Sequence, residues 1–338
     1  MTKIITRRAF NVSALTTVAA PFVLPAYAQT AEFNLKFGHE SLDTHPNTIR
    51  LNEAAAAITK RTNGRVNIQM FPNNQLGGST DMLSQTRSGA MDFTVLGTVI
   101  ISTLAPVAAI SGVGYAFPDY TRVYGAMEGD LGAYIRQSIE KVGLRPMKNI
   151  WNLGFRHVAN NIRPIKTPAD LAGIKIRVAV GALYVSLFKG LGAAPVSLNF
   201  SELYSSLQTK VIDGIETPLQ IFVTFKMYEV IKYASLTNHM WDGQWLIANA
   251  RSWSKIPADI QGIIEEEFNA ACLRQRDDLK AIETRARADL TEKGMVINDV
   301  DTAPFREALV KAGFYKEWKE KFDPAAWALL EKSVGAIN

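Results

Sequence analysis

Two arginines occupy positions where the chain could bind an anion. Arg177 lies near the carboxyl end of a predicted strand in which Ile174, Ile176 and Val178 alternate with polar residues. Arg156 has a similar position in a second predicted strand. Ligands of open α/β sheets bind at the carboxyl ends of strands, and a guanidinium group can hold a carboxylate through two parallel hydrogen bonds. The pair is a candidate carboxylate clamp, although two surface arginines with acidic partners would leave the same pattern.

A loop after the first predicted strand carries His39, Glu40 and His45. These side chains could hold a metal ion, but a third strong ligand is not evident. We therefore expect the loop to form the polar edge of a cleft, with no metal bound.

Patterns of nucleophilic catalysis are weak. Ser186 and Lys189 have the S-x-x-K spacing, but the K-T-G and S-D-N triplets that usually accompany it are absent from the sequence. Gly112 and Gly114 lack the third glycine of a dinucleotide loop and indicate a turn. We therefore expect that the protein is not an enzyme and that it binds no cofactor. A secreted hydrolase that uses Ser186 and Lys189, or the His39 loop, is the alternative from another class.

The composition indicates a globular protein of about two domains. The chain has 338 residues, of which 47% are hydrophobic and 20% are charged. Its one cysteine, Cys272, cannot form an internal disulfide or a cysteine-rich metal site, and we expect it to be buried.

The first 28 residues have the features of an export signal. Lys3, Arg7 and Arg8 precede an uncharged apolar stretch at 13–24, and a small-x-small triplet ends at Ala28. We expect cleavage after Ala28 and a periplasmic protein, exported by either the twin-arginine or the general secretory route.

Removal of this segment makes the protein much less basic. The formal net charge falls from +5 to +2 because three basic residues and no acidic ones are lost. A charge of this size gives no reason to expect nucleic acid or a polybasic membrane contact. The uncharged stretch 93–117 contains Pro106 and has acidic flanks, so we expect a buried strand, a loop and an apolar cleft lining there instead of a membrane span.

The elements that position these residues alternate along the chain between strand and helix, which is typical of open α/β sheets. A very long helix is predicted from Pro257 to about Glu292. Predicted strands are 33–38, 65–71, 91–96, 144–151, 155–159, 174–178, 212–216, 233–236 and 246–250. We expect an α/β protein with two lobes, each an open sheet flanked by helices, bridged by the long helix. The predicted lobes are 29–152 with 243–280, and 153–242 with 281–338.

Six blocks in a fixed order resemble the signatures of TRAP-transporter periplasmic solute-binding proteins, the DctP family. The blocks are 65–78 (RVNIQMFPNNQLGG), 170–177 (DLAGIKIR), 199–208 (NFSELYSSLQ), 211–214 (VIDG), 225–229 (FKMYE) and 235–239 (SLTNH). Together they extend the resemblance over nearly the whole chain after the export signal.

The resemblance implies a two-lobed receptor that closes on an organic acid and delivers it to an ion-gradient-driven membrane permease. It places the family's principal carboxylate-binding arginine at Arg177, the second arginine at Arg156 and the ligand-packing aromatic at Phe200. We expect the receptor to act as a monomer. A chemosensory or scavenging receptor without a permease is a further alternative.

Departures from the family pattern bear on the ligand. Thr217 stands where many members have asparagine, and Gly97 stands where sialic-acid receptors have glutamate. Trp241 is a candidate ligand contact, although a place in the core is equally compatible with its position. These features favour a small monocarboxylate, such as a 2-oxo or 2-hydroxy acid with an aromatic or aliphatic tail. A uronate is the main rival, because His39 and Glu40 could bind hydroxyl groups.

Overall fold

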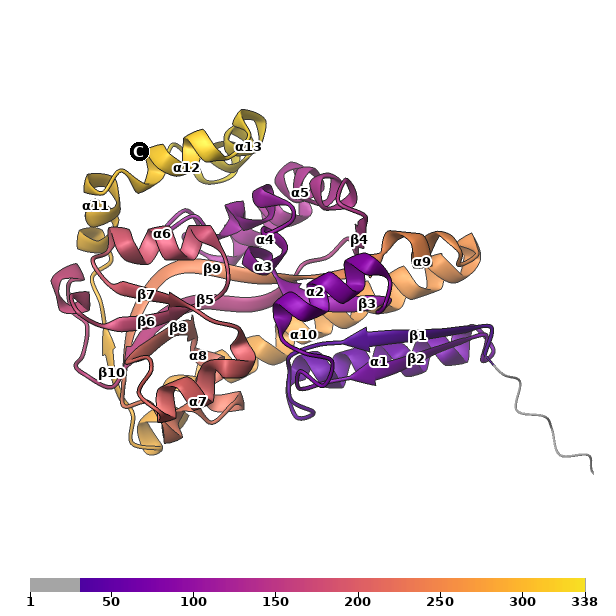
Figure 1. Cartoon of the computed structure of the whole chain (residues 1–338), viewed down its shortest axis with the longest axis horizontal. Helices are drawn as coiled ribbons and strands as arrows, with labels where there is room; N and C mark the ends of the chain where they lie inside the picture. Colours follow the sequence, from indigo (N-terminus) through magenta and orange to yellow (C-terminus); the bar gives the residue numbers. More distant parts are fainter. Residues whose placement is uncertain (1–30, 338) are drawn as a thin grey trace, which may run out of the picture.

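The computed structural model describes residues 31–337 and has a mixed α/β architecture, with one ten-stranded sheet between layers of helices (Figure 1). The predicted export signal lies outside the described residues. The strands are β1 (Phe33–Gly38), β2 (Val66–Phe71), β3 (Phe93–Gly97), β4 (Leu144–Pro146), β5 (Trp151–Asn160), β6 (Lys175–Val178), β7 (Ala194–Ser197), β8 (Gly214–Pro218), β9 (Tyr233–Asn249) and β10 (Val296–Asp299).

The helices cover both faces of the sheet. They are α1 (Pro46–Arg61), α2 (Ser79–Ser88), α3 (Thr98–Ile101), α4 (Tyr120–Glu128), α5 (Asp130–Glu140), α6 (Ala182–Gly190), α7 (Leu203–Gln208), α8 (Leu219–Thr224), α9 (Ala250–Ser254), α10 (Ala258–Glu292), α11 (Ala303–Lys311), α12 (Phe314–Lys321) and α13 (Pro324–Val334). Short 3-10 turns occupy Pro106–Gly112, Pro168–Leu171, Phe200–Glu202 and Met227–Glu229.

Strand directions bring two sets of carboxyl ends face to face. The sheet order is β2-β1-β3-β9-β5-β8-β6-β7, and the strands are parallel within β1–β3 and within β6–β8. Between these sets, β3–β9, β9–β5 and β5–β8 are all antiparallel. Three successive reversals make the two sets point in opposite directions, so both end over the middle of the sheet. We call these sets, with their helices, the β1–β3 side and the β6–β8 side.

The register places this meeting point on β9. Gly97 at the end of β3 pairs with Gln244, whereas Pro218 at the end of β8 pairs with Arg156, which pairs in turn with Met240. Residues 240–244 of β9 therefore lie between the two opposed sets of strand ends.

The predicted α/β class and open sheet are confirmed, but the sheet is continuous through both sides. The prediction of two separate short strands at 233–236 and 246–250 is wrong, because residues 233–249 form one strand, β9. The polar residues Asp242 and Gln244 suggest, from the sequence, that a strand ends there. In the structure both are buried and paired with neighbouring strands.

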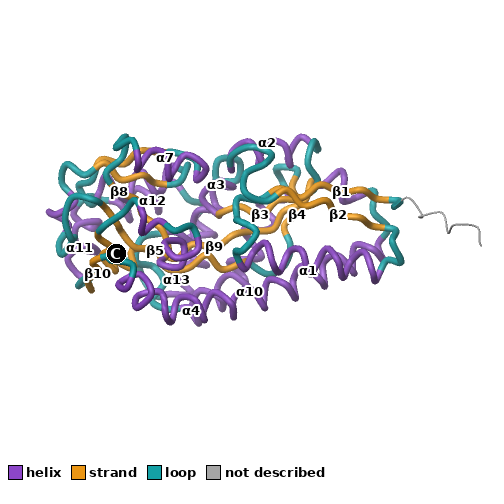
Figure 2. The backbone as a smooth tube through the Cα atoms, turned by 90° about the horizontal axis from the view of Figure 1, so that it is seen from below, coloured by secondary structure: helices purple, strands orange, loops and turns teal. Residues whose placement is uncertain are grey.

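The long helix is confirmed as α10, 35 residues from Ala258 to Glu292. Figure 2 shows α10 beside α1 along one face of the sheet. Arg50 of α1 holds Asp278 of α10 through two hydrogen bonds of 2.6 and 2.8 Å, which ties the two helices together. The lobe boundaries given above remain a prediction.

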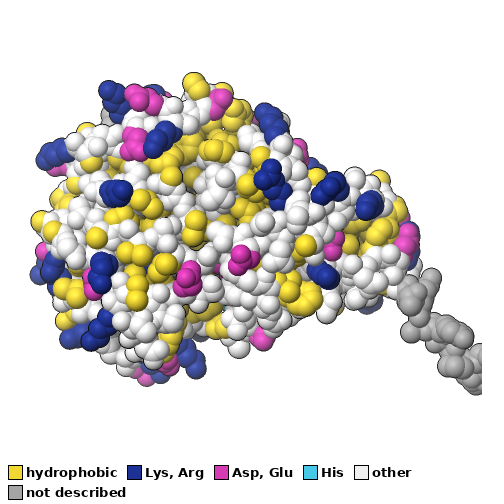
Figure 3. Space-filling view, viewed as in Figure 1, with side chains coloured by type: hydrophobic (Ala, Val, Ile, Leu, Met, Phe, Trp, Pro, Cys, Tyr) yellow, Lys and Arg dark blue, Asp and Glu magenta, His cyan; other side chains and the backbone are white. Residues whose placement is uncertain are grey.

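The uncharged stretch 93–117 folds as β3, α3 and the turn Pro106–Gly112, and most of its residues are buried. Within residues 31–337, no helix combines the length and the apolarity that crossing a membrane requires. On the face in Figure 3, basic and acidic side chains are interspersed and form no large field of one sign.

Candidate functional site

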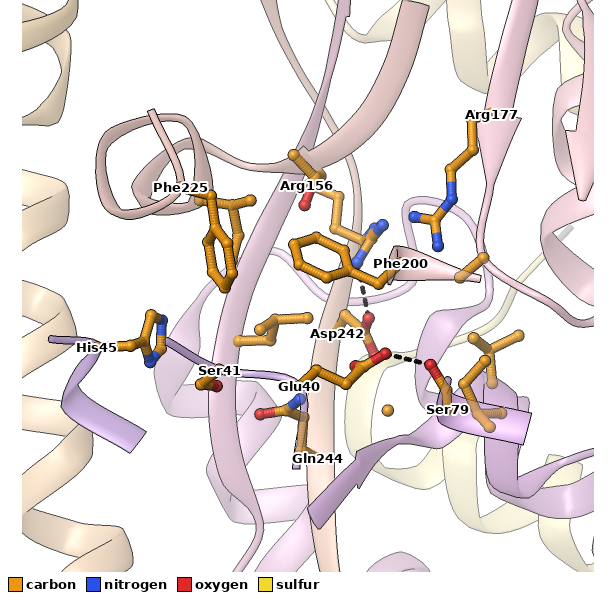
Figure 4. Close-up of a pocket in the computed structure, with 17 residues that line it drawn as sticks. Glu40, Ser41, His45, Ser79, Arg156, Arg177, Phe200, Phe225, Asp242 and Gln244 are labelled. Carbon is orange, nitrogen blue, oxygen red and sulfur yellow. Dashed lines mark hydrogen bonds and ion pairs between the residues drawn. The ribbon is translucent and has the colours of Figure 1, made fainter. Parts of the chain in front are cut away.

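A pocket lies over the middle of β9, where the two sets of strand ends meet (Figure 4). It holds about 600 Å³ of space that atoms do not fill, part of it open to solvent. The wall combines residues of the β1–β3 side, the central strands and the β6–β8 side: Glu40, Ser41, His45, Ser79, Gly97, Val99, Ile100, Leu153, Arg156, Arg177, Ala179, Phe200, Thr217, Ile221, Phe225, Asp242 and Gln244.

Arg177 is a buried cation without an acidic partner. Its residue is 3% exposed, and its Nε and Nη2 atoms donate to the carbonyl oxygen of Leu198 at 3.0 and 2.7 Å. No carboxylate of the described residues lies within 4.0 Å of it. The Phe200 ring centroid is 6.0 Å from its Cζ atom. Burial lowers the pKa of the Arg177 guanidinium, and an anionic ligand would reverse this penalty.

Arg156 is equally buried, but its charge is already balanced. Nη2 donates to the Glu216 carboxylate at 2.8 Å, and Nη1 donates to Asp242 at 2.8 Å. The Tyr184 ring lies 5.3 Å from the Arg156 Cζ atom. Arg156 thus reaches the pocket wall as part of an internal ion-pair network.

Two buried histidines extend this network behind the pocket. His239 Nε2 lies 3.3 Å from a Glu216 oxygen, and Nδ1 lies 2.9 Å from the Thr237 hydroxyl. Burial lowers the pKa of both His239 and His157, to about 3 for His157. Both rings are therefore neutral near pH 7. Burial raises the pKa of Glu216, but the Arg156 charge and the hydrogen bonds from His239 and Arg156 together outweigh it, and the net direction is downward.

Glu40 supplies a carboxyl group on the opposite wall, where it shares a hydrogen bond with Ser79 at the start of α2 (Figure 4). Burial raises the pKa of Glu40 and exceeds the opposing effects of the Ser79 hydrogen bond and the Arg177 charge. Asp242 adds to the rise through its negative charge. The pocket therefore has a cationic pole at Arg177 and a carboxyl pole at Glu40.

The remaining wall is largely apolar. Phe200 and Phe225 make an edge-to-face contact with centroids 4.8 Å apart. Ile221 lies on the same side, and Val99 and Ile100 come from α3. Thr217, at the end of β8, adds a hydroxyl to this surface.

Of the seven residues named from the sequence, the structure brings five to the pocket: Arg177, Arg156, Phe200, Thr217 and Glu40. The other two, His39 and Trp241, do not lie on its wall. Trp241 precedes the wall residue Asp242 in β9, where successive side chains point to opposite sides. His39 precedes the wall residue Glu40 just after β1 ends.

Both of these residues pack into the core. The His39 ring is fully buried 6.0 Å from Phe37, and burial lowers its pKa to about 4. Trp241 donates from Nε1 to Asn152 at 3.0 Å, and its ring lies 6.3 Å from Tyr124.

Several wall residues were not predicted from the sequence. Asp242 and Gln244 could have been predicted, because two polar side chains in an otherwise apolar stretch indicate a site. His45 had a place in the histidine loop, where its Nδ1 accepts from Asn47 N at 3.1 Å and caps α1. Ser79 and Phe225 carried no signal that separates them from ordinary capping and core residues.

The alternative hydrolase residues lie elsewhere. Ser186 on α6 donates to Glu317 of α12 at 2.8 Å, and Lys189 is exposed. Cys272 is buried as expected, with Sγ 3.2 Å from the carbonyl oxygen of Ile150. Within the described part of the chain, no group of three or more His, Cys, Asp and Glu side chains is placed to hold a metal ion.

Comparison with known proteins gives a consistent result. The family model for bacterial extracellular solute-binding proteins of family 7 (DctP) matches residues 37–321. The 2,3-diketo-L-gulonate-binding periplasmic protein YiaO of Escherichia coli is 30% identical over 82% of this chain and 84% of its own length.

Solved structures of TRAP periplasmic solute-binding proteins share the fold. One from Roseobacter denitrificans with bound L-galactonate is 31% identical, with a TM-score of 0.83 over 89% of this chain and 99% of that one. Another from Roseobacter denitrificans, with bound β-D-glucuronate, is 27% identical, with a TM-score of 0.85 over 90% of this chain and 100% of that one.

Proposed function

The chain belongs to family 7 of the bacterial extracellular solute-binding proteins, and from this premise we propose that it is the periplasmic receptor for a small monocarboxylate, which it delivers to a TRAP permease. The observation that carries the proposal is Arg177, a buried guanidinium that faces the pocket without a carboxylate partner among the described residues. The ligand carboxylate binds Arg177, and Arg156 presents its remaining N–H to the same ligand.

The charge distribution supports one carboxylate per ligand. Arg156 is balanced by Glu216 and Asp242, which leaves Arg177 to bind an added anion. A second carboxylate at the far end of the ligand would meet Glu40 and Asp242. Buried like charges repel strongly, so a dicarboxylate would bind much more weakly.

The apolar wall supports a 2-oxo or 2-hydroxy acid with an aromatic or aliphatic tail. Phe200, Phe225 and Ile221 offer a surface for such a tail. A uronate or other sugar acid is the second candidate, favoured by Glu40 and Gln244, which can bind hydroxyl groups, and by relatives named for sugar acids.

Hinge closure is the proposed mechanism, with lobes 29–152 plus 243–280 and 153–242 plus 281–338. Side chains already bridge the pocket at both edges. The Asn199 Oδ1 atom accepts from Thr80 N at 3.4 Å, and His45 Nε2 lies 3.3 Å from Gln220 Oε1. Closure removes water from the Arg177 ion pair and strengthens it. The receptor binds and releases its ligand unchanged, so it is not an enzyme.

Cleavage after Ala28 gives the processed receptor, which we propose is a periplasmic monomer. The mass of the protein purified from the periplasm tests the cleavage site, and sedimentation tests the oligomeric state.

Thermal shift against a panel of acids tests the function. The processed protein is freed of ligand by partial unfolding and dialysis, then heated with 2-oxo, 2-hydroxy, uronic, aldonic and dicarboxylic acids and with their amides. A ligand at 100 times its Kd adds about 2.7 kcal/mol of stability. We expect monocarboxylates to raise Tm and their amides to have no effect.

Two variants complete this test. Arg177→Ala should abolish the shift, and Arg87→Ala, which changes an exposed arginine of α2, should keep it. The absence of a shift with every carboxylate would contradict the proposal.

A further inference from the structure

Glu40 is the carboxyl group of the pocket that lacks a cationic partner. Within the described chain, no Lys, Arg or His nitrogen lies within 4.0 Å of it. Its direct partner is the neutral Ser79 hydroxyl of α2. Charged groups act on it across the pocket: Asp242 of β9 is unfavourable to a second negative charge, and Arg177 of β6 is favourable.

The buried and half-buried charges around the pocket are not balanced for an anion. Two guanidinium groups, Arg156 and Arg177, face three carboxyl groups, Glu40, Asp242 and Glu216. The histidines add no positive charge, since burial lowers the pKa of His39 and His45 to about 4 and that of His157 to about 3, and also lowers that of His239.

A bound carboxylate makes this imbalance worse. It adds a fourth acidic group to a closed, low-dielectric space that holds two fixed cations, and unpaired buried charges tend to neutralise instead. Asp242 and Glu216 are both bonded to Arg156. The net direction of the pKa is downward at Glu216, whereas at Asp242 burial exceeds the effect of the Arg156 charge and the pKa is raised. Glu40 has no such cationic partner.

We propose that the receptor takes up a proton from solvent when it closes on its ligand, and that Glu40 holds this proton. The inference rests on the proposed function, because the bound carboxylate supplies the extra negative charge. The proton binds a carboxylate oxygen of Glu40, no other bond changes, and capture of the monoanion becomes electroneutral. The neutral carboxyl group then donates its hydrogen to Ser79 or to an oxygen atom of the ligand.

The sign of the pH effect follows from linkage. Burial raises the pKa of Glu40 above its ordinary value. A bound carboxylate would raise this pKa further, whereas hydration of Glu40 in an open pocket would return it toward the ordinary value. Proton binding by Glu40 therefore contributes fully to ligand affinity at a pH below the pKa of Glu40 in the open form. This contribution is lost as the pH rises through the pKa of Glu40 in the complex. Over that window the affinity falls by about tenfold per pH unit for one proton.

Calorimetry measures the uptake directly. Phenylglyoxylate, D-glucuronate and L-galactonate are titrated into the processed protein near neutral pH in phosphate and in Tris, whose ionisation enthalpies differ widely. The slope of the observed enthalpy against the buffer enthalpy gives the number of protons bound. We expect about one proton for the parent and none for Glu40→Gln, which mimics the neutral carboxyl group and should still bind.

Matched variants locate the proton. Glu307→Gln, an exposed substitution on α11, should leave the uptake unchanged. Binding without uptake in the parent would overturn this inference and leave the proposed function standing. Uptake that persists in Glu40→Gln would show that another group holds the proton, and would overturn the assignment. If none of the three acids binds and the wider panel is also negative, both proposals are wrong.

Discussion

The regions around Arg156 and Arg177 contain the same cation at the same exposure, 3%, in opposite electrostatic states. Arg156 lies in β5, between β8 and β9, and each of these strands gives it a carboxylate. Arg177 lies in β6, away from the central strands, and bonds one carbonyl group, that of Leu198. Burial therefore does not distinguish these two arginines; the balance of charge around each of them does.

Replacing Arg156 should have the largest effect, on stability. Arg156→Ala leaves Glu216 and Asp242 buried without a cation, which costs about 3–5 kcal/mol. Urea unfolding followed by tryptophan fluorescence measures it. The triple variant Arg156→Leu, Glu216→Leu, Asp242→Leu should recover much of the loss, because it removes the whole buried network. A loss of less than about 1 kcal/mol in Arg156→Ala would show that Arg156 is not needed to neutralise Glu216 and Asp242, and would contradict the contrast with Arg177.

Replacing Arg177 should show the opposite pattern. Arg177→Ala should weaken ligand binding by about 2–5 kcal/mol, since the ligand carboxylate loses its partner. The free energy of unfolding of the ligand-free protein should stay the same or rise, because a desolvated cation is removed. Arg177→Lys should bind with intermediate affinity, as an ammonium group lacks the planar pair of donors. Calorimetric affinity within about threefold of the parent would exclude Arg177 as the carboxylate site.

Acid should destabilise the folded protein through its buried histidines. His157 and His239 lie beside the Arg156 network and His39 and His45 lie in the β1–β3 side, all with a pKa lowered by burial from 6.5. Below pH 6.5 the unfolded chain binds protons that the folded protein does not, so stability falls with the pH. Each histidine contributes about 1.4 kcal/mol per pH unit until its folded pKa is reached.

Urea unfolding at several pH values between about 7.5 and 5 measures this slope. His157→Gln should reduce it by one histidine's share, whereas Arg177→Ala should leave it unchanged. An unchanged slope in His157→Gln would argue against a neutral, buried His157.

A smaller contrast concerns the pocket edge near Arg177. Asn199→Ala removes the acceptor for Thr80 N and Oγ1, at 3.4 and 3.3 Å, and should weaken ligand binding by about 0.5–1.5 kcal/mol. The unfolding free energy should change little, because the contact forms between the two sides of the pocket. Asn67→Ala, an exposed asparagine of β2, is the matched control. Equal affinity of both variants would show that this contact does not contribute to closure.

The sequence was sufficient where a pattern is local. The helix predicted at 257–292 is α10, and the alternation around Arg177 located β6 and the residue at its end. Local alternation could not assign Trp241 and Asp242 to their faces, since β9 is buried on both sides and has no polar face.

The neutralised charge of Arg156 also could not be predicted from local sequence patterns. Its partners, Glu216 and Asp242, are 60 and 86 residues away in sequence, and the register of three antiparallel strands brings them together. The family resemblance indicated Arg156 as a second binding arginine, but no spacing in the sequence distinguishes a neutralised guanidinium from a free one.

The continuity of β5 and β9 has a consequence for how the molecule comes apart. These strands pair with each other, with two local shifts of register, and connect β3 to β8 through one ladder of paired strands. Neither side can melt while the other stays intact, because each would lose the strand that completes its sheet. Calorimetry should therefore record a single cooperative heat-absorption peak, and a gene cut between the sides should not yield two soluble fragments that fold independently.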